Sequence, residues 1–459
     1  MPAPRSCCCS SPKARTTTYR PFRSTEPVIG AGPAASSSAG PDYRGADIPE
    51  FLRGRTLQTG LTMERREDLN PDLYWHGVTA KRRPDQPALP HERGRGAGGS
   101  SSVNGLVAVR PEAADVDAWE QDYGARGWGF TEFLPALSRM ETDLDYGDMP
   151  YHGNSGPIPV IREPEEYWGD VDRALHDSAR EAGLPWFDDY NAPGSTGVAR
   201  YPGNSNRDGL RISTNHGYLD PARERDNLCI MGDAHVVAVE SAGDRATGVR
   251  LLGGTVVRPA ADGEVIVSAG AVHTPAVLLR SGIGTGSELR RLGIGQVAEL
   301  PVGVGLQDHA IVFIDFTPHE GRYLTQDLRP TNVAVHYSSG MPDTGPNDMC
   351  ILGTNHNYWF GNADSGLAVQ LNESHSRGSL DCRRPTRSSI RCSSSDCSRT
   401  RRIFRGWSTV SSARSTSCPG RHSAGSWWAN PAPPGGGGRV RTGQGRRARL
   451  FHCAHGRRG

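Results

Sequence analysis

The sequence lacks several features that mark common protein classes. No pair among its ten cysteines shows the CxxC spacing of a structural zinc site, and eight of the ten lie before residue 10 or after residue 380. A disulfide framework would need a secretory context, but the N-terminus shows no apolar signal-type segment. No run approaches the roughly eighteen apolar residues of a membrane span. We therefore expect a soluble, cytoplasmic protein with no metal site and no transmembrane segment.

Lysine and glutamate are missing from the last part of the chain. Residues 381–459 contain seventeen arginines and two aspartates, a charge of +15, which leaves −13 for residues 1–380 because the whole chain carries +2. Such an Arg/Ser/Gly-rich composition cannot bury enough apolar surface to fold. We predict a disordered tail, of the kind that a shifted reading frame would produce. The alternative is a basic tail that binds nucleic acid nonspecifically through its charge, so no specific nucleic-acid partner is expected.

The remaining chain is long enough for more than one hydrophobic core. A length of 459 residues favours two lobes over a single one. Apolar residues make up only 36% of the sequence, whereas glycine (57) and proline (34) are frequent, so part of the chain is not expected to fold. Residues 1–27 are rich in Ser, Arg, Pro and Thr without any periodicity, and we predict that they are disordered or foreign to the fold.

The segment 263–284 predicts a strand, a tight glycine turn and a helix. Val265–Val267 is a short β-branched run of the kind found in buried strands. Thr274 is a suitable N-cap, Pro275 suits the first helical position, and Gly282 suits the position just after the helix. Such a unit directs backbone amides at an anion, although the same pattern could belong to any α/β protein.

Two further glycine-rich segments are candidates for nucleotide binding. Gly30 and Gly32 follow a short apolar pair, as in the first turn of a dinucleotide-binding unit, but residues 35–40 are too short and Ser-rich for the helix that should follow. The run 94–102 could be a flexible Gly/Ser linker. It passes directly into Val103, Leu106 and Val107, which indicates that it is anchored in an apolar environment.

These segments resemble signatures of the GMC (glucose–methanol–choline) family of flavin oxidoreductases. Residues 270–284 match position for position: Gly-Ala, two free positions, Thr-Pro, an apolar pair and Ser-Gly-Ile-Gly. Residues 94–105 match Gly-Arg, two positions, Gly-Gly-Ser-Ser, two positions and Asn-Gly. Residues 303–309 are similar to a Gly-Val-Gly-x-Asn-Leu-Gln-Asp-His signature that has lost its x-Asn pair. Residues 38–43 resemble a Glu-Ala-Gly-Pro ending with Ser38 in place of the glutamate.

The resemblance covers about residues 90–380, with a weaker likeness at residues 28–43, and implies an α/β fold. In this family, a Rossmann-like FAD-binding lobe is assembled from non-contiguous segments and joins a substrate lobe that contains an antiparallel β-sheet. The boundaries that we predict by this resemblance are 28–155 and 205–310 for the FAD-binding lobe, with its first part incomplete. They are 156–204 and 311–380 for the substrate lobe, with its second part truncated.

The resemblance also implies a cofactor and the residues that bind it. The cofactor is FAD, and it is expected to be noncovalent because Ala97 and Gly98 offer no histidine where members with covalent flavin carry one nearby. Val236 would meet the adenine through its backbone, although it could equally be an ordinary core residue. The predicted cofactor-binding residues are Gly30, Gly32, Gly96, Gly99, Ser100, Asn104, Gly105, Val107, Val236 and Gly270.

The implied chemistry is the oxidation of a small-molecule alcohol to a carbonyl compound by hydride transfer to the flavin, with the electron acceptor left open. The family carries its base near the C-terminus, in a His-Pro-x-Gly-Thr-Cys-Arg segment, and nothing after Leu380 resembles it. We therefore name no catalytic residue, not even the tail histidines. His152 and His309 are interpreted as structural. The alternative is a non-catalytic remnant of the family with a disordered basic tail.

Overall fold

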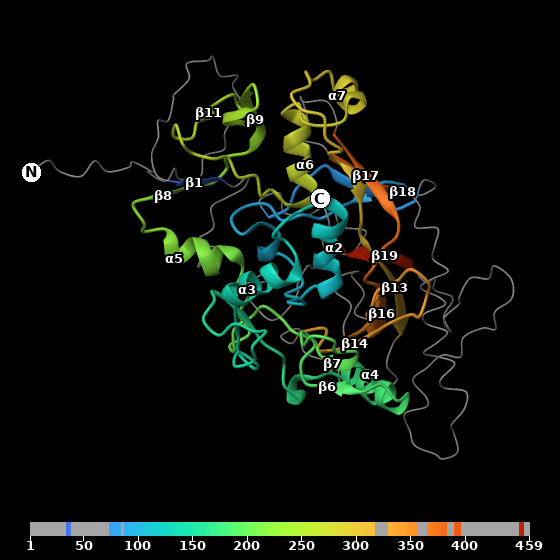
Figure 1. The fold of residues 1–459 in the computed structure, drawn as a ribbon. Helices are drawn as coiled ribbons and strands as arrows, with labels where there is room; N and C mark the ends of the chain where they lie inside the picture. The colour runs from blue at the N-terminus through green and yellow to red at the C-terminus, as the bar shows by residue number, and fades with distance from the viewer. Residues whose placement is uncertain are drawn as a thin grey trace, which may run out of the picture.

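The structure is a computed structural model that describes residues 34–37, 73–83, 87–316, 329–355, 365–382, 390–395 and 449–453. The predicted glycine turn with Gly30 and Gly32, and the predicted disordered residues 1–27, lie outside these ranges. The described chain is a mixed α/β protein, as predicted, with antiparallel sheets prominent among its strands. In Figure 1, helices α6 and α7 lie at one end of the molecule, and strands β6 and β7 lie with helix α4 at the other.

The largest sheet has seven strands in the order β19-β13-β16-β15-β14-β7-β6. All neighbours are antiparallel except β6 and β7, which are parallel. The alternation of Ile311, Phe313 and Asp315 in the sequence predicts strands in the region 311–376, and these strands and the predicted antiparallel sheet are confirmed. The strands are β6 (Trp186–Phe187), β7 (Gly197–Arg200), β13 (His309–Phe316), β14 (Val333–Tyr337), β15 (Met349–Thr354), β16 (Ser365–Leu371) and β19 (Arg449–Cys453).

Helix α4 (Asp170–Glu181) packs on this sheet against β7, β14 and β15. Its apolar positions Val171, Leu175 and Ala179 lie on one face, as the helical period requires, and are buried in the largest hydrophobic cluster. Gly183, with φ of 84°, ends the helix in the left-handed conformation. The spacing of apolar residues over 171–182 in the sequence predicts an amphipathic helix with Leu175 facing inward, and the structure confirms it.

A second sheet of five strands has the order β12-β17-β18-β2-β3. Helices α6 (Gly270–Arg280) and α7 (Gly286–Leu292) share a hydrophobic cluster with β17 and β2. Leu279, which is completely buried, is among the members contributed by α6. The strands are β2 (Val78–Lys81), β3 (Leu89–Pro90), β12 (Val304–Leu306), β17 (Arg377–Cys382) and β18 (Ile390–Ser395).

Two stretches of the arginine-rich tail are strands. β18 pairs with β17 and β2, and β19 pairs with β13 at the edge of the seven-stranded sheet. The predicted disorder from residue 381 is wrong for these stretches, because backbone pairing does not require the apolar side chains on which that prediction depended. β17 itself runs two residues past the predicted boundary and buries Cys382. The other tail residues lie outside the described ranges.

The predicted strand at Val265–Val267 is not formed. Residues 263–269 have no regular secondary structure, and Ile266 is 82% exposed. A strand requires a paired neighbour, and no described strand pairs with this segment. β1 (Ala34–Ser37) instead pairs in parallel with β8 (Leu228–Met231) in a sheet of two strands.

The sequence also predicts a meander of three strands at residues 228–231, 235–239 and 248–252, and this prediction is only partly correct. β8 does not pair with β9 (Val236–Ala242), which forms an antiparallel sheet with β10 (Arg245–Leu251) and β11 (Val256–Val257). The structure also describes the helical elements α2 (Ala113–Tyr123), α3 (Phe130–Met140), the 3-10 turn η4 (Glu165–Tyr167), the π-helical turn η5 (Asn215–Leu219) and α5 (Asp220–Ala222).

Helix α6 begins at Gly270, earlier than the predicted cap at Thr274. Pro275 therefore lies inside the helix rather than at its first position. As the sixth residue of the helix, Pro275 lacks the N–H that would donate to the carbonyl four residues earlier. The predicted end is confirmed: Gly282 has a φ of 81°, and the amides of Gly282 and Ile283 donate back to Leu279 and Leu278. None of the described helices is long and apolar enough to cross a membrane.

The carboxylate of Asp172 joins α4 to the seven-stranded sheet and is completely buried. It accepts hydrogen bonds from the Asn332 side chain at 2.9 Å and the Asn355 side chain at 2.6 Å. It also accepts from the backbone amides of Asn332, Val333 and Gly169. Five donors from three chain segments thus depend on one side chain.

We expect Asp172→Ala to lower the free energy of unfolding by about 3 kcal/mol or more, because the substitution leaves several buried donors unsatisfied. Asp177→Ala on the same helix is the matched control, since the Asp177 side chain is 66% exposed. This control should change stability by less than about 0.5 kcal/mol. Urea unfolding followed by tryptophan fluorescence measures both, and equal midpoints would contradict this role for Asp172.

Candidate functional site

The glycine-rich segment 94–102 folds into a tight turn followed by η3 (Gly99–Ser102), one turn of 3-10 helix. Gly96 and Gly98 have φ values of 105° and 80°, which glycine adopts without strain. A Cβ on Gly94 would lie 2.4 Å from the carbonyl oxygen of Gly99, so the two ends of the turn approach as closely as glycine allows. The segment is thus a compact turn rather than a flexible linker, and residues 94–102 are called the glycine turn below.

Gly99 and Gly270 differ from these packed glycines. Both have positive φ, 53° and 81°, and a Cβ on either would meet no protein atom within 4 Å. Gly270 is the first residue of α6, and Gly99 is the first residue of η3. Each therefore presents bare backbone at the start of a helical turn to open space. This is the arrangement through which a nucleotide phosphate or a flavin approaches a backbone closely.

Polar side chains hold the glycine-rich segment in place. The Ser100 hydroxyl accepts a hydrogen bond from the Gly94 amide at 3.0 Å. The Asn104 side-chain oxygen accepts from the Leu106 amide and from the Arg211 guanidinium at 2.8 Å. The Ser101 hydroxyl accepts from the Thr214 amide. Ser100 and Asn104, both predicted to line the cofactor, thus also fix the backbone of the turn.

Arg211 is a buried cation beneath this turn, with only 2% of its surface exposed. Its guanidinium donates to the Ser101 carbonyl as well as to Asn104. Burial lowers the pKa of Arg211 to about 10, so the side chain stays charged at neutral pH. Sequence reasoning missed this residue, because its position among polar residues, without helical or strand periodicity, carries no signal of burial.

Trp75 brings three of the predicted segments together. Its ring stacks on His273 of α6 at a centroid distance of 4.2 Å and meets the edge of His235 at 5.0 Å. The guanidinium of Arg95, from the glycine-rich segment, lies 5.9 Å from the same ring. His235 directly precedes Val236, so the start of β9, the start of α6 and the glycine turn all lie around one side chain. Sequence reasoning missed Trp75 too, because it stands in a polar, loop-like stretch.

The two histidines in this group are neutral at physiological pH. Burial, together with the charges of Arg280 and Arg95, lowers the pKa of His235 to about 4. Burial and the charge of Arg280 lower the pKa of His273 to about 3. The positive charge around Trp75 therefore comes from arginines, which suits a negatively charged ligand such as a diphosphate.

The remaining predicted residues lie at the following places in the structure. Val107 forms a β-bridge with Gly203, which leads the chain from the glycine segment towards the seven-stranded sheet. Gly105 is half-buried beside it, and Val236 is the half-buried first residue of β9. Gly30 and Gly32 lie outside the described residues. His309 forms a hydrogen bond between its Nδ1 and the Leu371 carbonyl at 3.1 Å.

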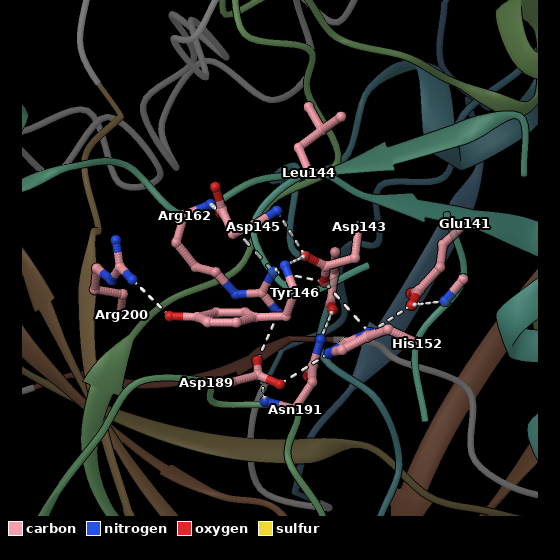
Figure 2. A network of polar contacts seen from close by, with 12 residues as sticks. Glu141, Asp143, Leu144, Asp145, Tyr146, His152, Arg162, Asp189, Asn191 and Arg200 are labelled. Carbon is pink, nitrogen blue, oxygen red and sulfur yellow. Dashed lines mark hydrogen bonds and ion pairs between the residues drawn. The ribbon is translucent and has the colours of Figure 1, made fainter. Parts of the chain in front are cut away.

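A group of charged side chains surrounds His152 (Figure 2). Glu141, Asp143 and His152 are the one set in the described ranges whose ligand atoms come close enough to hold a metal ion, all within 4.8 Å. Arg162 already contacts both oxygens of Asp143, at 2.7 and 2.6 Å. A cation would therefore compete with guanidinium groups for the same carboxylates, so we assign the group to an ion-pair network.

The sequence of this chain matches a known protein family and several of its members. The profile described as GMC oxidoreductase matches residues 25–311. The chain is 35% identical over 350 residues to the 5-(hydroxymethyl)furfural oxidase of Methylovorus sp. (strain MP688), covering 70% of this chain and 64% of that protein. It is 37% identical over 228 residues to the oxygen-dependent choline dehydrogenase of Escherichia coli O6:K15:H31 (strain 536 / UPEC), covering 49% and 41%. The chain thus spans roughly two fifths to just under two thirds of these relatives.

Solved structures share the fold at lower identity. Pyridoxine 4-oxidase from Mesorbium loti superposes with a TM-score of 0.70 at 22% identity, covering 83% of this chain and 75% of that one. Formate oxidase from Aspergillus oryzae RIB40, whose structure concerns FAD modification, gives 0.66 at 20% identity, covering 83% and 76%. These neighbours confirm the predicted fold class. Since the family profile spans more than half of the sequence, the chain belongs to the GMC oxidoreductase family.

Proposed function

We propose that this protein binds FAD noncovalently and oxidises a small-molecule alcohol to a carbonyl compound. Membership of the GMC oxidoreductase family supports the reaction class, and relatives named for choline and for 5-(hydroxymethyl)furfural support an alcohol as substrate. One structural observation supports FAD as the cofactor. Gly99 and Gly270 each present bare backbone at the start of a helical turn. No protein atom lies within 4 Å of the point that a Cβ would occupy on either residue. When bound, FAD supplies the hydride-accepting chemistry.

The residues of this chain supply binding and orientation. Gly99 and Gly270 allow close approach of the cofactor to the backbone, and Arg95 and Arg280 contribute positive charge near its diphosphate. Ser100 and Asn104 hold the turn through the hydrogen bonds described above. The remaining proposed cofactor-binding residues are Gly30, Gly32, Gly96, Gly105, Val107 and Val236.

Noncovalent binding is supported by the residues of the turn itself. Ala97 and Gly98 carry no nucleophile, and the Cβ position of Gly98 is filled by the Ser102 hydroxyl at 2.4 Å. A covalent bond to the flavin from this part of the turn would need a nucleophilic side chain such as histidine, and position 98 has no room for one. Denaturation of the protein should therefore release FAD that is chemically unchanged.

We also propose that the chain forms a substrate lobe and a cofactor lobe with the boundaries predicted above. Residues 156–204 and 311–380 contribute β7, β14, β15 and β16 to one antiparallel sheet, which supports a common substrate lobe. Residues 28–155 and 205–310 contribute the glycine turn and α6, which meet at Trp75 and support a common cofactor lobe. Alcohol oxidation also requires a base within hydrogen-bond reach of the substrate hydroxyl, and we assign no residue to that role.

FAD binding can be tested with one substitution at the open position of the turn. We expect Gly99→Asn to weaken FAD binding at least about tenfold, because asparagine tolerates the left-handed backbone while its side chain fills the open space. Flavin fluorescence quenching, titrated on protein stripped of FAD, gives the dissociation constant.

The matched control is Gly183→Asn at the end of α4. Gly183 also has a positive φ, 84°, and no protein atom near its Cβ position, but it lies just after the helix that covers the seven-stranded sheet. This variant should bind FAD as the unchanged protein does. Equal affinity of the Gly99→Asn variant and its control would contradict the proposed cofactor site.

The reaction itself is tested separately from binding. With FAD bound and oxygen excluded, addition of choline, 5-(hydroxymethyl)furfural or simple primary alcohols should bleach the oxidised-flavin absorbance, since hydride transfer reduces the cofactor. A dye acceptor should then restore the absorbance. Protein that binds FAD but is not bleached by any alcohol of the panel would favour the non-catalytic alternative.

A further inference from the structure

Both ring nitrogens of His152 face carboxylate oxygens inside the protein (Figure 2). Its Nδ1 lies 2.6 Å from Glu141 Oε1 and 3.3 Å from Asp143 Oδ2, and its Nε2 lies 2.8 Å from Asp189 Oδ2. The imidazole ring is completely buried, as is the Asp143 carboxylate, and the carboxylates of Glu141 and Asp189 are nearly so. The histidine is therefore not a surface residue that happens to lie near acids.

The geometry specifies how many protons this group holds. An ionised carboxylate can only accept hydrogen bonds, and a neutral imidazole has one donor nitrogen and one acceptor nitrogen. A neutral His152 would thus point a lone pair at one of the two carboxylates. Only a ring protonated at both nitrogens donates to both Glu141 and Asp189.

The charges of the group also balance when His152 is protonated at both ring nitrogens. Glu141, Asp143 and Asp189 are opposed by Arg110, which contacts Glu141 at 2.6 Å, and by Arg162, which contacts Asp143 and Asp189 at 2.6 Å each. Three carboxylates then face two guanidinium groups, and the imidazolium supplies the third positive charge. Asp145 lies at the rim, 4.0 Å from Arg162 and 3.7 Å from the exposed Arg207.

The group connects parts of the chain that are distant in sequence. Glu141 and Asp143 belong to β4 (Glu141–Asp143), which pairs with β5 (Ile158–Val160), whereas Asp189 lies in the connection between β6 and β7. Asn191, in the same connection, accepts from the Arg110 amide at 3.0 Å and donates to the Ala108 carbonyl at 2.9 Å. Residues 107–110, which leave the glycine turn, are thus attached to the edge of the seven-stranded sheet.

We propose that His152 is held as an imidazolium at neutral pH, and that its extra proton ties β4 and residues 107–110 to the β6–β7 connection through Asp189. These contacts are a positioning device, because Asn191, beside Asp189, holds the backbone of residues 107–110 through the Arg110 amide and the Ala108 carbonyl. The tie stands on the placement of the side chains, whether or not the protein binds FAD.

The pKa values agree with this assignment. Burial alone would lower the pKa of His152, but the hydrogen bonds with Asp189 and Glu141 and the charge of Asp143 outweigh it and raise that pKa above 6.5. Burial would raise the pKa of Asp189, yet the hydrogen bond with His152 and the charge of Arg162 lower it. Tyr151, whose ring lies 4.9 Å from the His152 ring, is the other titratable group against it, and burial raises its pKa.

The sign of the pH dependence follows from the raised pKa. A histidine that binds its proton more tightly when folded contributes stability below the pKa of the unfolded chain, and loses it as the pH rises through the folded pKa. Each unit of difference between the two values corresponds to about a tenfold change in the unfolding constant. Stability should therefore fall on the alkaline side of pH 6.5.

The test uses the full chain with ring-15N-labelled histidine, followed by NMR from about pH 5 to about pH 9. His152→Gln identifies the signals of His152. We expect both of its nitrogens to show imidazolium shifts at about pH 7 and to titrate above the ordinary histidine range. Neutral-imidazole shifts at that pH, which would put the proton on a carboxyl group, would overturn the proposal.

Asp189→Asn separates this assignment from a merely structural role. An asparagine amide can donate to His152, so a neutral ring is then satisfied, and the titration of His152 should shift to lower pH. An unchanged titration would overturn the proposal. If His152→Gln does not fold, the Asp189→Asn variant still identifies the signals, since they are the ones that move.

Unfolding by urea provides the second measurement. The midpoint of the unchanged protein should decrease as the pH rises through the folded pKa of His152, and that decrease should be smaller in Asp189→Asn. His176→Gln, at a partly exposed histidine of α4, should keep the full decrease. A midpoint independent of pH in this window, or zinc binding by the unchanged protein that Asp189→Asn and His152→Gln abolish, would contradict the imidazolium tie.

Discussion

The middle of this structure depends on the buried ion pairs that Arg162 forms with Asp143 and Asp189. The Arg162 side chain is almost completely buried, with both oxygens of Asp143 on one nitrogen and an oxygen of Asp189 on the other. Its guanidinium also lies 4.9 Å from the ring of Tyr146. Removing one partner from a buried ion pair leaves an uncompensated charge, which costs about 3–5 kcal/mol. The loops on either side are therefore fixed by charge in a region where helices and long strands are few.

The glycine turn and α6 serve a different purpose from this charged network. Gly94 is required because backbone approaches backbone there, whereas Gly99 and Gly270 leave space that the protein itself does not fill. Trp75, His273 and Arg95 hold the two segments close to each other. One set of contacts thus keeps the scaffold rigid, and another keeps bare backbone accessible, which is what a site for a large cofactor requires.

Residues 263–269, which precede α6, show that a segment with the composition of a strand stays irregular when no other described strand pairs with it. Val265, Ile266 and Val267 have the composition of a buried strand, yet the segment has no regular structure and exposes Ile266. Strand composition indicates only that a segment would suit a sheet, while the sheet itself needs donors and acceptors from an adjacent chain. The same reasoning explains why β18 and β19 pair despite an unfavourable composition.

The sequence by itself determined the family, the antiparallel strands after residue 310, helix α4 and the glycine that ends α6, because these depend on residue order, local period and backbone freedom. It also identified His152 as a hydrogen-bonded structural residue. Only the tertiary structure decided that β8 pairs with β1, that Trp75 joins three segments, that Arg211 is buried, and that His152 meets two carboxylates. These features depend on contacts between residues that lie far apart along the chain. Local patterns carry no information on which distant segments meet, and burial and protonation are set only once they do.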